Sequence, residues 1–261
     1  MDSHYKVSKA DSCNGNPELK KEYEGLGFDY PSAAASVLYA SICTRPDIAF
    51  ACKEVCKVMA DPGPKHVPVV KSILKYLRGT RTWGLKYTAP SEIMDTFTAE
   101  ALTLNAHCDA SYGDDPDTRR STQAFVAKLC GGAVGWFSQG QKSTALSTAE
   151  AELIALADAI KEVLYMRQAM EFLHVPQLGP TIIYEDNQAV VSTAHNPGQN
   201  HGKLKHVAIR THRVQEEVRL ETVDVIFKPT GEMEADVLTK ALGRKQFQLL
   251  ARAILGYEPL K

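Results

Sequence analysis

The chain has 261 residues, of which 44% are hydrophobic, and this length accommodates one large domain or two modest ones. Its 30 Lys and Arg residues nearly balance 31 Asp and Glu residues, so a net charge of −1 excludes attraction of nucleic acid through the overall field and leaves only a local patch. Six cysteines without a CxxC pair argue against a zinc knuckle or a secreted disulfide framework, so we expect an intracellular protein. The lack of a long apolar run excludes a membrane span.

The first part of the chain predicts a small helical unit behind a loose end. Residues 1–28 are polar and carry charges of both signs without apolar periodicity, so we expect a flexible N-terminal arm. Residues 29–92 predict three short helices, because prolines suit the first turns at Pro31 and Pro46 and a third apolar face stops at Gly79.

Residues 93–261 predict a mixed α/β domain that ends in a C-terminal helix. Residues 102–109 alternate as a half-buried strand would, and residues 122–138 predict two further strands joined at Gly131–Gly132. A long helix follows from the capping residue Ser147, and the later segments alternate strand and helix. The order βββαβαβα, with one inserted basic helix, predicts a five-stranded mixed sheet flanked by helices.

One loop contains the sequence motif of a polymerase active-site turn. Residues 112–115 read YGDD, and a turn of that type needs a buried strand on each side. Only the upstream run is apolar, because the chain continues from Pro116 with polar loop residues. We therefore interpret YGDD as a solvated loop, and the preceding Asp109 either supplies a site or only starts the turn.

Four acidic residues occupy places that converge in such a sheet. Asp109 and Asp186 end strands, whereas Glu152 and Asp236 lie early in helices, and these ends meet at one sheet edge. Carboxylates this close repel by about 4 kcal/mol per pair unless cations neutralise them. Oxygen ligands favour Mg²⁺, and two ions about 4 Å apart can assist phosphodiester hydrolysis. Singly, each acid also suits a turn or cap, so only the ordered set predicts a metal site.

Two glutamates compete for one place in this set. Glu150 and Glu152 are separated by about 200° around a helix, so they cannot both face the sheet edge. Glu150 follows Ser147 at the spacing of a capping box, which leaves Glu152 as the expected ligand.

A local basic surface and two polar residues are candidates for nucleic-acid binding. A basic helix is often only a solvated face, but beside a metal site it suits phosphate contacts. Polar groups next to the metals suit the 2′-hydroxyl of RNA. The expected substrate-binding residues are Asn187, Gln188, Lys203, Lys205, His206, Arg210, His212 and Arg213.

Several blocks together resemble a known family. The ribonuclease H domain of Ty1/copia-type retrotransposon Pol polyproteins is similar, in order and spacing, to CDASYGDDPDTRRST, GGAVGWFSQGQKSTALSTAEAEL, IIYEDNQAVV, KHVAIRTHRVQEEV and ADVLTK. The segment that joins the reverse transcriptase to this nuclease, its thumb or connection, is similar to SVLYASICTRPDIAFA and ILKYLRGT. The resemblance therefore identifies a polyprotein fragment with a ribonuclease H-like fold.

The resemblance also implies a site and an activity. The family's catalytic metal ligands correspond to Asp109, Glu152, Asp186 and Asp236, and an RNA-contacting glutamine corresponds to Gln188. This correspondence favours Asp109 over the YGDD loop. It implies a ribonuclease H that uses two Mg²⁺ ions, replaceable by Mn²⁺, to cut the RNA strand of RNA–DNA hybrids during reverse transcription, leaving 5′-phosphate ends. The expected partners are the hybrid and the remainder of the polyprotein, without membrane contact, in cytoplasmic virus-like particles or the nucleus.

The chain departs from the family at a few positions. Tyr112 stands where relatives often carry tryptophan, and TQAF replaces a more usual Thr-Ser-Gly-aromatic run. The loop before Asp236 lacks the histidine of many cellular ribonucleases H, and either Glu232 or Glu234 substitutes for it or both lie in a solvated loop. Two other functions remain: a catalytically silent nucleic-acid-binding domain, and a structural domain that supports a larger polymerase.

Overall fold

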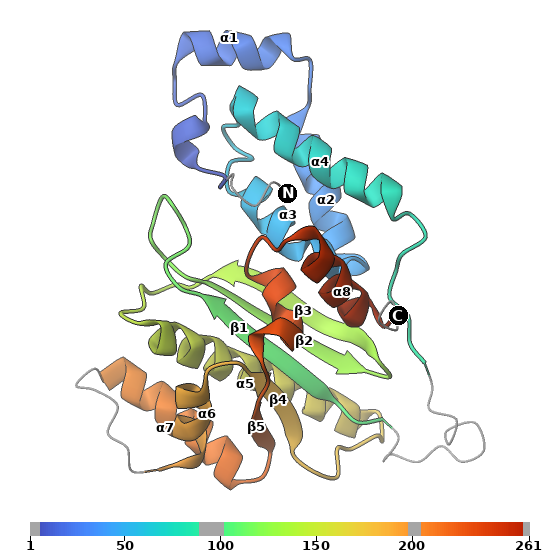
Figure 1. Cartoon of the computed structure of the whole chain (residues 1–261), viewed down its shortest axis with the longest axis vertical. Helices are drawn as coiled ribbons and strands as arrows, with labels where there is room; N and C mark the ends of the chain where they lie inside the picture. The colour runs from blue at the N-terminus through green and yellow to red at the C-terminus, as the bar shows by residue number, and fades with distance from the viewer. Residues whose placement is uncertain (1–5, 89–101, 198–204, 258–261) are drawn as a thin grey trace.

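A five-stranded mixed sheet forms the centre of the C-terminal half of the chain (Figure 1). The computed structural model describes residues 6–88, 102–197 and 205–257. The sheet order is β3-β2-β1-β4-β5, with β1 to β3 antiparallel and with β4 and β5 parallel to β1. This arrangement confirms the expected ribonuclease H-like fold class. The strands are β1 Asn105–Ser111, β2 Thr122–Leu129, β3 Gly132–Gly140, β4 Thr181–Glu185 and β5 Val223–Phe227.

A tight turn joins β2 and β3 close to the predicted position. Cys130 and Gly131 form its tip with φ values of 50° and 82°, and two successive positive φ values suit a tight antiparallel hairpin. The turn therefore lies one residue earlier than the expected Gly131–Gly132 junction.

Helices cover both faces of the sheet. One face packs against α5, α6 and α7, and its core includes Cys108, Leu156 and Ile160. The other face packs against α8 and the short 3-10 helix η7, with Val126 and Leu250 in that core. These elements are α5 Thr148–Phe172, α6 Gln188–His195, α7 Lys205–Arg219, η7 Glu234–Leu238 and α8 Arg244–Leu255.

Strand β1 is more deeply buried than its alternating sequence predicts. Ala106 and Cys108 are fully buried as expected, but His107 and Asp109 on the opposite face are each only 1% exposed. The covering segment includes η7, whose Glu234 Oε1 lies 3.7 Å from His107 Nε2. The expectation of a half-buried strand is wrong because polar side chains can face a covered surface when charged partners meet them there.

A second unit of four helices precedes the sheet. Its core contains Tyr30, Val37, Val55 and Val70, and the Tyr30 hydroxyl donates to Val55 O at 2.9 Å. No helix within the described ranges is long and apolar enough to cross a bilayer. The helices are α1 Pro17–Gly25, α2 Tyr30–Cys43, α3 Ala49–Cys56 and α4 Val67–Gly79.

The expected flexible N-terminal arm is anchored to the helical unit at a few buried residues within 6–28. Val7 and Cys13 are 1% and 5% exposed, and the Cys13 thiol donates to Pro62 O at 3.0 Å. Asn16 caps α1 by accepting hydrogen bonds from two backbone N–H groups. Isolated apolar anchors of this kind produce no periodicity, so the sequence alone predicted a loose segment.

The YGDD loop joins the two units. Lys57, directly after α3, lies 2.6 Å from Asp115. Beyond the loop, Lys53 donates to the Thr122 hydroxyl at the start of β2, and Asp117 accepts from the Ser8 hydroxyl at 2.6 Å. The residues form a loop as expected, and Tyr112 is 47% exposed, but Asp115 contacts the helical unit, so the loop is only partly solvated. The predicted domain boundary between residues 92 and 93 lies outside the described residues.

The last strand of the antiparallel half also contacts the helical unit. Trp136 of β3 donates its indole N–H to Ser41 O of α2 at 2.9 Å. On the opposite side of the joint, Lys86 N donates to Leu255 O of α8 at 2.8 Å. The helical unit is thus bonded both to the sheet and to the C-terminal helix.

Asp115→Asn tests the joint at the YGDD loop. The side chains of Asp115 and Lys57 are only 15% and 18% exposed, so removing this charge should lower the free energy of unfolding by about 2 kcal/mol. Urea unfolding would measure the loss, with the exposed Glu171→Gln on α5 as the matched charge-removal control. Equal losses in the two variants would contradict a stabilising role for this loop.

Candidate metal centre

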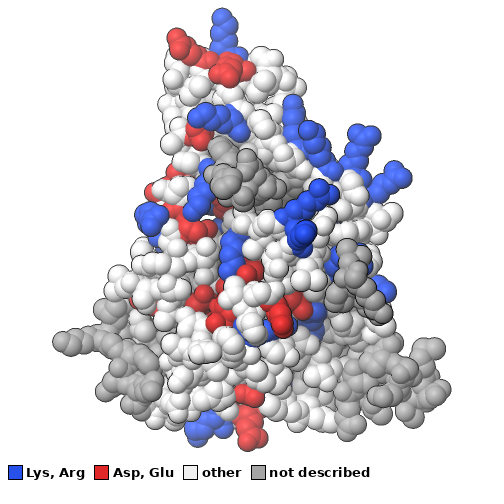
Figure 2. Space-filling view, in the orientation of Figure 1, with Lys and Arg blue, Asp and Glu red and all other residues white. Residues whose placement is uncertain are grey.

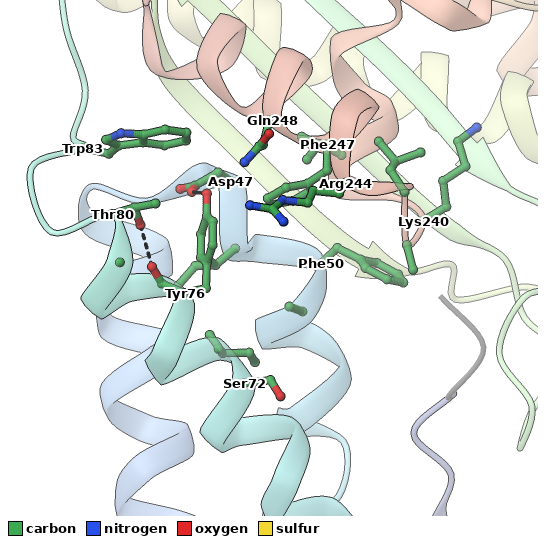
Figure 3. A pocket seen from close by; sticks show the side chains of 17 residues that line it. Asp47, Phe50, Ser72, Tyr76, Thr80, Trp83, Lys240, Arg244, Phe247 and Gln248 are labelled. Carbon is green, nitrogen blue, oxygen red and sulfur yellow. Dashed lines mark hydrogen bonds between the residues drawn. The ribbon is translucent and has the colours of Figure 1, made fainter. Parts of the chain in front are cut away.

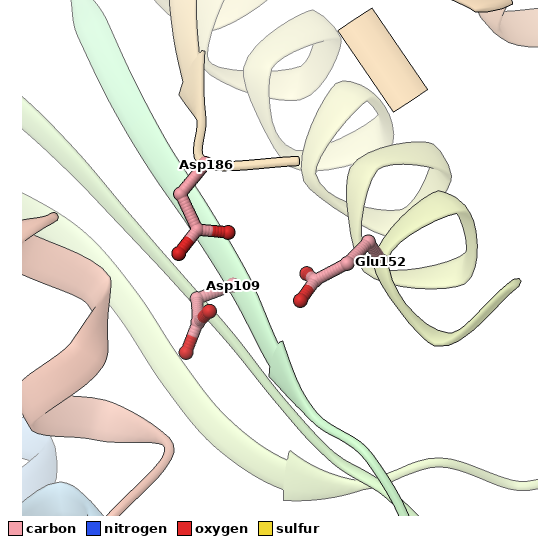
Figure 4. Close-up of side chains that lie close together, drawn as sticks. All are labelled: Asp109, Glu152 and Asp186. Carbon is pink, nitrogen blue, oxygen red and sulfur yellow. The ribbon is translucent and has the colours of Figure 1, made fainter. Parts of the chain in front are cut away.

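Three carboxylates converge at one edge of the sheet (Figure 4). Asp109 lies near the end of β1, Asp186 follows β4, and Glu152 projects from the second turn of α5. One oxygen atom from each lies within 4.8 Å of the other two. Because β1 and β4 are parallel neighbours, their carboxyl ends share an edge, as the sequence predicts.

The choice between the two glutamates of α5 agrees with the helix geometry. Ser147 caps the helix by accepting from Glu150 N at 3.1 Å, and the Glu150 carboxylate accepts from Leu146 N at 2.9 Å. Glu152 is 3% exposed and faces the other carboxylates. The structure therefore places Glu152, not Glu150, in the cluster.

Asp236 lies beside this group of three rather than within it. Its side chain shares a cation with Asp109, because Lys240 Nζ is 2.8 Å from Asp236 Oδ1 and 3.7 Å from Asp109 Oδ2. Burial, and then the charge of Asp109, raises the pKa of Asp236 to about 7. The four predicted residues are thus electrostatically linked, three through their convergence and Asp236 through Asp109 and Lys240.

Burial and mutual repulsion disfavour the charged form of these groups. Burial is the main cause that raises the pKa of Asp109, and it also raises the pKa of Glu152 well above its ordinary value. The neighbouring carboxylates Glu185, Asp109 and Asp186 add to the shift at Glu152. Without added cations, these carboxyl groups therefore keep their protons at pH values at which solvent-exposed Asp and Glu side chains are ionised.

Several residues at the site escaped the sequence analysis. Glu185 is fully buried behind Asp186, where it accepts from Asn187 N at 3.1 Å and from the Cys108 thiol at 3.3 Å. Lys240 lies four residues after Asp236, and this spacing was the signal for an ion pair on a helical turn. Glu185 gave no separate signal, because a strand that ends in two acids does not reveal which one faces the site.

Two hydroxyl groups orient the carboxylates. Thr239 donates to Asp109 Oδ2, and Thr230 donates to Asp186 Oδ2 at 2.7 Å. Glu152 Oε2 is buried and has no hydrogen-bond partner among the described residues. Such an oxygen needs a cation or a proton, so this set of oxygen ligands fits a hard divalent ion.

The cluster opens into a cleft of about 680 Å³ that also holds the polar residues after Asp186. The Asn187 side-chain oxygen caps α6 by accepting from Ala189 N at 3.0 Å, which leaves its amide group as a donor. Gln188 is exposed on the cleft wall. Both predicted residues therefore lie where a ligand of the carboxylates would reach them.

The described members of the predicted basic helix do not gather at this cleft. Arg213 pairs with Glu216 at 3.2 Å and with Glu217 at 2.7 Å on its own helix, and His212 is exposed. Arg210 lines a separate cavity. Lys203 and the side chains of Lys205 and His206 lie outside the described residues.

The loop before Asp236 contains no free acid at position 234. Glu234 is 8% exposed, and Lys128 Nζ donates to its two oxygens at 3.0 and 2.7 Å. Glu232 is exposed. The solvated-loop interpretation thus fails for Glu234, because a lysine on β2 holds it against the sheet.

Comparisons with known proteins give extended sequence matches, although no family model matches the chain. The Pol polyprotein of transposon Tnt 1-94 from Nicotiana tabacum is 36% identical over 94% of this chain and 17% of its own length. The Pol polyprotein of transposon RE1 from Arabidopsis thaliana is 30% identical over 87% of the chain and 15% of its own length. The secreted RxLR effector protein 161 of Plasmopara viticola is 36% identical over 52% of the chain and 90% of its own length.

Solved structures with similar coordinates include two ribonucleases H. One is the N-terminal ribonuclease H domain of a Mycobacterium tuberculosis protein, with a TM-score of 0.40, 12% identity, and coverage of 58% of this chain and 97% of that one. The other is a ribonuclease H1 in complex with an RNA/DNA hybrid, with a TM-score of 0.40, 13% identity, and coverage of 52% and 94%.

The raised pKa of Asp236 predicts a pH-dependent stability. A carboxyl group whose pKa is about 7 when folded and about 4 when unfolded contributes stability below pH 4 that is lost as the pH rises through 7. In a chelator, the Tm of Asp236→Asn should therefore fall less than that of the native chain between these pH values. Thermal unfolding across this range would measure the difference, and parallel curves would contradict it.

Lys240→Met tests the internal cation. Without Lys240, Asp109 and Asp236 lose their nearest positive charge, so the metal-free protein should lose about 2 kcal/mol of stability. Added Mg²⁺ should then raise the Tm of this variant more than that of the native chain. Differential scanning calorimetry would compare both with the exposed control Lys245→Met. The same magnesium-induced rise in all three proteins would refute the role of Lys240.

Proposed function

Because this chain belongs to the Pol polyproteins of Ty1/copia-type retrotransposons, we propose that it is a metal-dependent ribonuclease H that cuts the RNA strand of RNA–DNA hybrids. The observation that carries the proposal is the meeting of Asp109, Glu152 and Asp186 at one edge of a ribonuclease H-like sheet. The chain spans 17% and 15% of the length of the two polyprotein relatives, and we propose the remainder of such a polyprotein as its partner.

The four carboxylates would hold two Mg²⁺ ions, with Mn²⁺ as a substitute. Asp109, Glu152 and Asp186 are close enough to share ions, and Asp236 lies next to Asp109 across Lys240. Bound ions would activate a water molecule and stabilise the leaving oxygen of the phosphodiester, giving 5′-phosphate and 3′-hydroxyl ends. Burial of Asp109 and Glu152 supports tight positioning, since their side chains have little room to turn.

The chain's own residues would orient the carboxylates and the RNA. The Thr230 and Thr239 hydroxyls hold Asp186 and Asp109 by hydrogen bonds. The Asn187 amide group and Gln188 line the cleft next to these carboxylates, where a 2′-hydroxyl of the cut strand can meet them. This contact would distinguish RNA from DNA.

Arg210 would make a second contact with the hybrid. It lines a cavity of about 290 Å³ together with Lys142, and Asp158 and Glu162 line the same cavity. Lys161 also lines it, but it already pairs with Asp158 at 2.6 Å. A phosphate of the hybrid would therefore contact Arg210 and Lys142 there.

The catalytically silent alternative would follow from the loss of one carboxylate. All four are present, and two hydroxyl groups hold two of them in place. A purely structural role would not require a buried glutamate oxygen such as Glu152 Oε2, which has no hydrogen-bond partner in the described part of the chain.

Cleavage of a labelled RNA–DNA hybrid in Mg²⁺ tests the proposal. Asp109→Asn keeps the shape of the side chain but removes a charge that the ions need, so the rate should fall by more than about a hundredfold. Asp114→Asn/Asp115→Asn, in the YGDD loop, should retain cleavage when assayed at a temperature where it is folded. Activity in Asp109→Asn together with none in the loop variant would show that the YGDD loop, not Asp109, forms the active site.

A further inference from the structure

Two stretches of the chain carry only positive charge. Residues 67–87 contain five Lys or Arg residues and no Asp or Glu, and residues 237–256 contain four and none, although the net charge of the chain is −1. In the space-filling view, blue side chains project from the upper right of the molecule, over α4 (Figure 2). The nine residues are Lys71, Lys75, Arg78, Arg81, Lys86, Lys240, Arg244, Lys245 and Arg252.

Six of these nine charges lie on α4 and α8, two helices that contact each other. Lys71, Lys75 and Arg78 are exposed and share one face of α4, because their spacing of four and three residues follows the helical turn. Arg244 is exposed in the first turn of α8. The two helices meet between Tyr76 and Phe247, whose ring centres are 5.5 Å apart.

A cavity of about 590 Å³ lies between these helices and α3 (Figure 3). Its wall is mainly apolar, with the aromatic rings of Phe50, Tyr76, Trp83 and Phe247 around it. The guanidinium of Arg244 extends into the space between the two units. Such a cavity suits a ligand that joins a flat apolar group to an anion, because the rings can stack on the flat group and the cation can bind the anion.

The cavity adjoins the carboxylate cleft. Lys240 lines both spaces, and its ammonium group contacts Asp109 and Asp236 on the cleft side. The carboxylate cleft and the cavity are therefore neighbours that share Lys240 in their linings.

We propose that the α4–α8 groove binds a single nucleic-acid strand that extends from the hybrid. The groove comprises this cavity, which Arg244 lines, and the exposed cations Lys71, Lys75 and Arg78 on the adjoining face of α4; these four cations are called the basic rim. The inference rests on the proposed function of the cleft. Unpaired bases would stack on the aromatic rings while the rim binds phosphates, a combination that serves single strands regardless of sequence. A blunt duplex has its bases paired, so it cannot place one in the cavity and would gain only rim contacts.

The test compares a blunt hybrid with the same hybrid carrying a single-stranded DNA extension, on either end of either strand. Binding is measured by fluorescence anisotropy in chelator, where no metal-dependent cleavage competes. We expect one extension to tighten binding by about tenfold, as stacking of a base or two would give. Equal affinity of blunt and extended hybrids would overturn the proposal.

Variants of the rim locate the effect. Lys71→Gln/Lys75→Gln/Arg78→Gln should abolish the gain from the extension and lower the salt dependence of binding, by about 0.7 in log–log slope for each phosphate that the rim no longer neutralises. A matched triple variant, Lys20→Gln/Lys21→Gln/Arg219→Gln, removes exposed cations from α1 and α7 and should keep the gain. Equal behaviour of the two triple variants would refute the groove as the site.

A pair of substitutions tests the stacking. Phe247→Leu keeps an apolar side chain but removes the ring, so it should lose most of the gain, whereas Phe247→Tyr should keep it. A retained gain in Phe247→Leu would overturn the aromatic part of the proposal.

Cleavage of the blunt hybrid in Mg²⁺ is measured separately. Cutting without any gain in affinity from the extension rejects only the groove, and a gain in affinity without cutting rejects only the nuclease.

Discussion

Repulsion between buried carboxylates is the constraint around which the C-terminal half is organised. Asp109 and Glu152 are almost fully buried, and Asp186 lies within 4.8 Å of both. Such a cluster is tolerated only where protons, cations or hydroxyl donors reduce the charge. The segment after β5 provides these groups, since Thr230, Thr239 and Lys240 all come from it, and its η7 helix also covers the second face of β1.

The helical unit extends this arrangement beyond the sheet. Its α3 helix binds the loop that follows β1, through Lys57 and Asp115, and its α4 helix borders the same α8 helix that closes the sheet face. The strand that carries Asp109 is therefore followed directly by a segment fixed to the other unit. We infer that the position of the helical unit and the geometry of the carboxylates are mechanically linked.

The sequence predicted those features that follow from local patterns. The strands, the cap at Ser147 and the convergence of Asp109, Glu152 and Asp186 are confirmed, because periodicity and strand ends determine them. It missed contacts between distant segments. Lys57 and Asp115 form an ion pair although 58 positions separate them in the sequence, so the role of the YGDD loop was not predicted. Single buried residues such as Val7 produce no periodicity, so the anchoring of the N-terminal segment was not predicted either. The basic surface was expected on α7, where Arg213 instead pairs with glutamates.

The contact between Trp136 and Ser41 has a consequence for self-association. Strand β3 is an outer strand of the sheet, and an outer strand offers unpaired backbone groups to any other strand of suitable length. Here the helical unit packs against that strand and fixes its indole ring by a hydrogen bond. The helical unit therefore occupies space beside this outer strand, and we expect its removal to favour strand-to-strand association of neighbouring copies.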